Sequence, residues 1–155
     1  EDMGPEASGD MLTTYRASVL DAVGAHGGVV DKFIGDGALV LFGLGERDGA
    51  ADAVAAAETL ARRLKDAPYR VGIGLHYGEA MVGAVGDDRR LEFTVIGDVV
   101  NVASRIEALT KEEESVALAS AEALGEAPRE GWRALGARSL RGRGAEVEIF
   151  AYDPV

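Results

Sequence analysis

The chain has 155 residues, 47% of them hydrophobic and 28% charged, which suits one folded domain with its own core. Its formal net charge of -11 argues against nucleic-acid binding, which needs a basic surface, and against direct contact with an anionic membrane. The absence of cysteine and the presence of only two histidines exclude disulfides, thiolate catalysis and the usual zinc sites.

No apolar run approaches the ~20 residues of a transmembrane helix. No signal peptide is visible either, so we expect a cytoplasmic protein. An acidic domain can still bind a nucleoside triphosphate, because Mg²⁺ and a few local cations supply the positive charge.

The first half of the chain predicts a helix, a hairpin and a second helix. Apolar residues recur at helical spacing after Pro5, and a Gly-Gly pair is suited to end that helix. Two apolar segments joined by Gly35-Asp36-Gly37 read as paired strands, and an alanine-rich amphipathic helix then runs up to Pro68. The expected ranges are 11–23, 29–34, 38–43 and 48–67.

The second half predicts several strands, one long helix and one short helix. Residues 69–86 read as two strands with a bend near Gly78 and Glu79. The other expected strands are 91–95, 115–119, 132–140 and 147–153, and the expected helices are 97–111 and 120–124. Helices that alternate with strand pairs predict an α/β (α+β) domain, with one mixed sheet and helices packed mainly on one face.

The hairpin turn at residues 35–37 has two readings. Asp and Gly are common turn residues, so the segment can be a purely structural turn. However, Lys32 lies within a strand that is apolar apart from Asp31, and a cation there is costly unless it reaches an acceptor. Asp36 at a glycine-flanked tip is also the type of ligand that Mg²⁺ prefers. Metal binding is therefore the alternative to a structural turn.

The helix near residue 98 presents a polar pair. Asp98 is a suitable N-cap, and the predicted buried stripe comprises Val99, Val102, Ala103, Ile106 and Leu109. Asn101 and Arg105 are four residues apart and project from one face, where they could donate to phosphoryl oxygens. The alternative is a solvated face with a salt bridge from Arg105 to Glu107 or another neighbour.

The segment SLRGRG at residues 139–144 is basic within an acidic chain. Arg141 and Arg143 in this glycine-rich turn could bind terminal phosphates, or the segment could be a surface hairpin. The sequence has no P-loop, and the segment around residue 74 lacks the glycine spacing of a dinucleotide-binding turn.

Four segments in this order resemble the class III adenylate/guanylate cyclase catalytic domain. They are GGVVDKFIGDGALVLFG, VGIGLHYGEAMVGAVG, LEFTVIGDVVNVASRIEALT and LRGRG. The resemblance covers nearly the whole chain and implies a ferredoxin-like mixed sheet covered by helices. It also implies a homodimer with head-to-tail pairing, whose active sites form at the interface from both chains.

The resemblance implies roles for residues in the hairpin and the strand at 91–95. Asp36 falls on the second metal-binding Asp of the family, which holds two Mg²⁺ or Mn²⁺ ions per active site. Lys32 falls on the purine-reading Lys of adenylate-specific members, and Thr94 on their second purine-reading position. This combination favours ATP over GTP as the substrate.

Further roles fall on the long helix and the basic turn. Asn101 matches the residue that orients the ribose, and Arg105 the one that stabilises the phosphate in the transition state. Arg141 is the expected cation near the terminal phosphates, with Arg143 the less favoured choice. The implied reaction converts ATP to 3′,5′-cyclic AMP and pyrophosphate.

One part of the family pattern has no counterpart in this chain. The family opens with an apolar strand that carries its first metal-binding Asp, whereas only EDMG precedes the first helix here. We therefore expect residues 1–155 to form a single, N-terminally incomplete cyclase domain whose sheet lacks a central strand. An upstream regulatory domain is expected in the parent protein.

Three alternatives to adenylate cyclase activity stay open. The chain can be a catalytically inactive homology domain that serves dimerisation, nucleotide binding or regulation. It can be a guanylate cyclase, or a plain ferredoxin-like binding domain.

Overall fold

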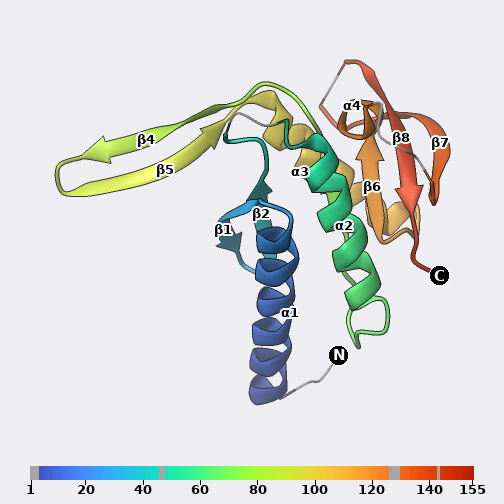
Figure 1. Cartoon of the computed structure of the whole chain (residues 1–155), viewed down its shortest axis with the longest axis horizontal. Helices are drawn as coiled ribbons and strands as arrows, with labels where there is room; N and C mark the ends of the chain where they lie inside the picture. The colour runs from blue at the N-terminus through green and yellow to red at the C-terminus, as the bar shows by residue number, and fades with distance from the viewer. Residues whose placement is uncertain (1–3, 46–47, 126–129, 143) are drawn as a thin grey trace.

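The computed structural model describes residues 4–45, 48–125, 130–142 and 144–155, with side chains at all of these except 85 and 90–94. The helices are α1 (Pro5–Ala25), α2 (Ala50–Leu64), α3 (Asp98–Glu112) and α4 (Ala121–Leu124). The strands are β1 (Val29–Ile34), β2 (Gly37–Leu41), β3 (Ile73–Leu75), β4 (Met81–Asp87), β5 (Arg90–Ile96), β6 (Ala117–Ser120), β7 (Trp132–Ser139) and β8 (Glu146–Tyr152) (Figure 1). The expected mixed α+β class is confirmed.

Within the described residues the strands form three sheets. The central one is four-stranded with the order β3-β6-β8-β7, in which β3 runs parallel to β6 and the other pairs are antiparallel. The hairpins β1–β2 and β4–β5 are two-stranded sheets of their own. The expectation of one continuous sheet was therefore wrong for the described residues, because β2 is hydrogen-bonded only to β1 and β3 only to β6.

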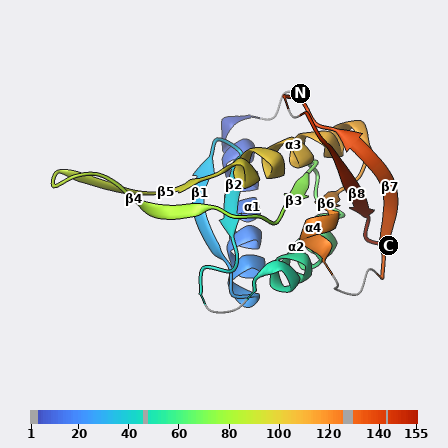
Figure 2. The same ribbon diagram turned by 90° about the horizontal axis from the view of Figure 1, so that it is seen from above.

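Helices lie on both faces of the four-stranded sheet, which corrects the expectation that they pack mainly on one face (Figure 2). Successive residues of β6 point to opposite faces. Ala117 and Ala119 belong to a core with Val54 of α2, whereas Leu118 packs in a core with Ile106 of α3. Residues 117–120 are all buried because both faces of this strand are covered.

A third core holds the β1–β2 hairpin against α1 and α2. Val19 and Val23 of α1 and Leu60 of α2 are buried together, with Phe33 of β1 and Val40 of β2 packed against them. The hairpin is therefore held by side-chain packing, although within the described residues it pairs with no strand of the central sheet. Within the described residues, no helix has the length and hydropathy needed to span a bilayer.

Helix α3 lies directly on the backbone of β3. A Cβ atom placed on Gly74 would lie 2.6 Å from the carbonyl oxygen of Ala103 and would also clash with the Glu107 backbone nitrogen. Val102 and Ile106 of α3 pack against other strands of the sheet and are fully buried. The helix begins at Asp98 with Gly97 as its N-cap, so the prediction of Asp98 as N-cap was wrong by one residue.

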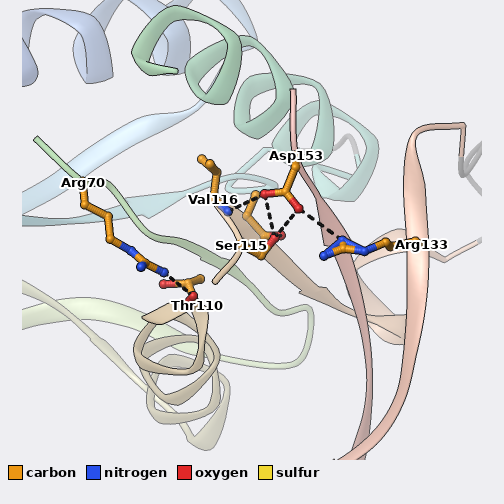
Figure 3. Close-up of polar contacts among 7 residues, drawn as sticks. Arg70, Thr110, Ser115, Val116, Arg133 and Asp153 are labelled. Atoms are coloured by element: carbon orange, nitrogen blue, oxygen red, sulfur yellow. Dashed lines mark hydrogen bonds and ion pairs between the residues drawn. The ribbon is translucent and has the colours of Figure 1, made fainter. Parts of the chain in front are cut away.

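Polar contacts of Asp153 stabilise the C-terminal part of the domain (Figure 3). Asp153 follows β8 and accepts hydrogen bonds from the Val116 N–H at 2.8 Å and the Ser115 hydroxyl at 3.1 Å. It also pairs with Arg133 of β7 at 3.1 Å. These contacts join the segment after α3 to the strands at the far edge of the sheet.

Candidate functional site

The β1–β2 turn presents Asp36 to solvent. Ile34 pairs with Gly37, which leaves a two-residue loop, and Gly35 takes a φ of +60° at its first position, as in a type II′ turn. Arg16 of α1 donates to the Gly35 carbonyl oxygen at 3.3 Å, and its guanidinium carbon lies 4.8 Å from the centre of the Phe33 ring. The loop that carries Asp36 is therefore tied to α1.

The Asp36 carboxylate itself is exposed and has no hydrogen-bond or ion-pair partner among the described residues. Mg²⁺ usually takes one or two protein carboxylates and completes its coordination with water and substrate phosphates. Within the described part of the chain no group of three or more potential ligands forms a ready-made metal cage. Asp36 thus fits one ligand position of a site shared with phosphate oxygens.

Lys32 lies on β1, four residues before Asp36. Its ammonium nitrogen is 3.5 Å from Oδ2 of Asp31, and the side chains are 43% and 10% exposed, respectively. Lys32 therefore presents its charge at the surface, beside a carboxylate for which the sequence predicts no role.

The predicted pair on α3 has the arrangement expected from its spacing. Asn101 is exposed and Arg105, one turn later, is partly buried. Neither side chain has a hydrogen-bond or ion-pair partner among the residues that the structure describes, so the alternative salt bridge from Arg105 to Glu107 does not form there. An unpaired guanidinium beside an unpaired amide offers several donors to an incoming anion.

The basic turn after β7 approaches Arg105. A Cβ atom on Gly142 would lie 3.3 Å from Nη2 of Arg105, and Gly142 has a φ of +76° that favours glycine. Arg141 precedes Gly142 and is exposed. The structure thus brings the segment with Arg141 next to Arg105 on α3. A shared phosphate-binding role for Arg105 and Arg141 requires this proximity. Arg143 lies outside the described residues.

The predicted base-reading residue Thr94 is described only by its backbone. Thr94 lies in β5 opposite Gly83, but its side chain is outside the described part of the structure, so its role in base recognition stays a prediction. Among the described residues, no hydrogen bond or ion pair joins Lys32 or Asp36 to the group on α3.

Glu107 is a carboxylate near the hairpin that sequence reasoning did not identify as part of this region. Burial, and then the negative charge of Asp36, raise the pKa of Glu107 above its usual range. Burial and the charge of Asp36 also raise the pKa of Tyr15 on α1. The hairpin tip is therefore within electrostatic range of both α1 and α3. No local sequence signal indicates this proximity, because it depends on tertiary packing.

The raised pKa of Glu107 predicts a pH-dependent stability effect. Burial and Asp36 disfavour the ionised carboxylate in the folded state, so its pKa is higher when folded than when unfolded. The cost is absent below the unfolded pKa and grows to its full size as pH rises through the folded pKa. Glu107→Gln should therefore raise Tm at pH 7 by about 1–2 °C, discounted for partial exposure.

Thermal unfolding followed by circular dichroism at pH 7 and pH 4 measures this effect. The advantage of the Gln variant should shrink at the lower pH, where Glu107 is mostly protonated in both states. Glu112→Gln, which changes an exposed carboxylate at the end of the same helix, is the control. An unchanged difference between the two pH values would contradict the electrostatic cause.

A model of the adenylate and guanylate cyclase catalytic domain family matches residues 10–151. Among curated relatives, an adenylate cyclase of Anabaena cylindrica is 38% identical over 72% of this chain, and adenylate cyclase 1 of Rhizobium meliloti is 32% identical over 97%. The matched region is 24% of each of these relatives, so the chain spans about a quarter of their length.

Solved structures show the same fold. A bacterial light-regulated adenylyl cyclase superposes with a TM-score of 0.80 at 25% identity, covering 97% of this chain and 80% of that one. The adenylyl cyclase CyaB from P. aeruginosa gives 0.77 at 26% identity, with 99% and 86% covered. The guanylyl cyclase Cya2 gives 0.75 at 30% identity, with 96% and 81% covered. Similar structures thus include cyclases of both base preferences.

Proposed function

Because the chain belongs to the adenylate and guanylate cyclase catalytic domain family, we propose that it converts ATP to 3′,5′-cyclic AMP and pyrophosphate. The observation that carries this proposal is the set of cationic and amide donors around α3. Arg105 and Asn101 have no partner among the described residues, and the turn with Arg141 lies against Arg105.

These donors suit the proposed reaction. The ribose 3′-hydroxyl attacks the α-phosphorus in line, the bond to the β-phosphate oxygen breaks, and pyrophosphate leaves. Negative charge develops on the phosphorus oxygens, where a preorganised guanidinium is most effective. Arg105 stabilises that charge, Asn101 orients the ribose, and Arg141 binds the departing phosphates. Positioning and electrostatics account for most of the catalysis, as in other phosphoryl transfers.

The proposed cofactor is Mg²⁺ or Mn²⁺, two ions per active site, with Asp36 as one protein ligand. When bound, these ions would lower the pKa of the attacking hydroxyl and neutralise charge on the attacking and leaving oxygens. The exposed, unpartnered carboxylate of Asp36 supports its part in this site. The further ligands would come from substrate phosphates, water and residues that the described structure does not place beside Asp36.

The proposed assembly is a homodimer in which each active site uses both chains. Lys32 would read the base in one active site of the dimer and Asp36 would hold metal in the other, so each active site would take residues from both chains. The β4–β5 hairpin also extends from the body of the domain (Figures 1 and 2). Its base exposes apolar side chains, with Met81 at 75% and Ile96 at 59% exposure, as an interface element would. The parent protein is proposed to be cytoplasmic and to carry a regulatory domain.

Base preference follows from hydrogen-bond complementarity. Lys32 can donate to adenine N1, and a Thr94 hydroxyl can accept from the 6-amino group. Guanine carries a proton on N1, which Lys32 cannot accept, so GTP is mismatched. A GTP-using enzyme is the second candidate, favoured by the 30% identity to the guanylyl cyclase Cya2.

Turnover of ATP and GTP under the same conditions with Mn²⁺ separates these candidates. We expect kcat/KM for ATP to exceed that for GTP at least about tenfold, the effect of one well-placed hydrogen bond in a buried site. Lys32→Glu should reduce or reverse the preference, because Glu accepts from guanine N1. A wild-type preference for GTP would contradict the ATP assignment, and formation of neither cyclic nucleotide would favour an inactive homology domain.

A further inference from the structure

Strand β1 contains a bulge next to the lysine proposed to read the base. Val30 pairs with Val40 and Lys32 pairs with Leu39, so two steps along β1 match one step along β2. Asp31 is the extra residue. In a regular strand, adjacent side chains point to opposite faces, and Asp31 could not meet Lys32. A bulge interrupts this alternation and can redirect a side chain.

The two side chains of the Asp31–Lys32 ion pair differ in their exposure to solvent. The Asp31 side chain is 10% exposed, and its Oδ2 has no hydrogen-bond partner among the described residues. Burying a carboxylate is costly unless a cation is near. Among the described residues, the ammonium of Lys32 lies 3.5 Å from Oδ2 of Asp31. Lys32 is 43% exposed and can take other rotamers. The packed carboxylate therefore restrains the direction of the exposed lysine.

The ion pair also leaves donors free. A lysine ammonium has three N–H groups, and Asp31 approaches it from one side only. The remaining N–H groups point away from the carboxylate and can reach an acceptor at the surface. The bulge thus gives Lys32 a preferred direction without using up its hydrogen-bonding capacity.

We infer that Asp31 is a positioning residue for base recognition: from the β1 bulge it holds the Lys32 ammonium in the direction that reads the purine edge. This inference rests on the proposed function and adds a determinant of substrate choice that does not itself touch the nucleotide. Removing the Asp31 charge should therefore weaken the discrimination between adenine and guanine rather than nucleotide binding as a whole.

The test measures binding, independently of turnover. The affinities of N-methylanthraniloyl-ATP and N-methylanthraniloyl-GTP are determined by fluorescence titration for the wild type and for Asp31→Asn. The ratio of the two affinities is expected to fall about fivefold in the variant, in the range of partly exposed ion pairs. Asp31→Glu keeps the charge and should retain most of the wild-type ratio. Asp21→Asn, an exposed carboxylate on α1, makes the same charge change and should leave the ratio unchanged.

A double-mutant cycle with Lys32→Met separates positioning from a structural role. If Asp31 acts through Lys32, then Asp31→Asn has no further effect on the ratio in the Lys32→Met background. An equal effect in both backgrounds, or no effect of Asp31→Asn in the wild type, would overturn the inference and leave the proposed function intact. If the wild type binds neither nucleotide, or does not prefer the adenine probe, the proposed ATP specificity fails as well.

Discussion

Replacing Arg105 with alanine is expected to lower kcat for cyclic AMP formation about 100- to 1,000-fold, the usual cost of losing one transition-state charge donor. The effect on KM for ATP should be smaller, because the guanidinium acts on charge that develops during the reaction. Folding should be retained, since Arg105 has no hydrogen-bond or ion-pair partner in the described part of the chain.

Steady-state kinetics together with Tm measurements check this expectation. Arg105→Lys retains the charge but loses the planar fork, so it should recover only part of the activity. Arg63→Ala removes an exposed arginine on α2 and is the matched control. A rise in KM with an unchanged kcat would show that Arg105 binds substrate and transition state equally. Full activity of Arg105→Ala would contradict its catalytic role.

Gly74→Ala is expected to produce the largest loss of stability, about 3 kcal/mol or more, because overpacking here meets rigid backbone. The new Cβ would lie 2.6 Å from the Ala103 carbonyl oxygen and 2.7 Å from Cα of Glu107. Neither atom belongs to a flexible side chain, so α3 must move away from β3. Because α3 also carries Arg105, activity should fall even at temperatures where the variant is folded.

Urea unfolding and activity assays on the same protein measure both effects. Gly9→Ala is the control: Gly9 lies in α1, and a Cβ added there would have no atom within 4 Å. Alanine favours the helix over glycine, so the stability of this control should rise slightly. If Gly74→Ala were as stable as the wild type, the close contact between α3 and β3 would be wrong.

Elements with strong local signals could be predicted from the sequence. The apolar spacing at 11–23 identified α1, although the helix begins at Pro5, where proline is suited to the first turn. The Gly35-Asp36-Gly37 signal identified the β1–β2 hairpin, and the C-terminal strand pair is within one residue of its expected bounds. These elements depend on short-range periodicity and turn chemistry, which a single sequence displays.

Strand pairing could not be predicted in the same way. Residues 69–86 read as two strands joined by a bend, but β3 pairs with β6 and β4 pairs with β5. Pairing depends on which long-range partner is available, and the local pattern of Ile73–Leu75 is compatible with several. For the same reason, the burial of β6 on both faces was not expected from its sequence.

The residue types of the candidate site were predicted from the sequence and stay predictions, whereas the contacts of these residues could not be predicted. The family resemblance implies the roles of Lys32, Asp36, Asn101 and Arg105. Their spacing predicts only that Asn101 and Arg105 share one face of a helix, and both lie on α3. The ion pair of Lys32 with Asp31 depends on a bulge, and the tie between Arg16 and the Gly35 carbonyl oxygen depends on the packing of α1. A one-residue change of register leaves no reliable local signal.

The formation of cyclic AMP tests the central claim most directly. The purified chain is incubated with ATP and Mn²⁺, and cyclic AMP, pyrophosphate, ADP and phosphate are quantified by chromatography. We predict cyclic AMP and pyrophosphate in equal amounts, with both products lost together in Arg105→Ala. ADP and phosphate as the products, or no cyclic AMP despite nucleotide binding, would contradict the proposed activity.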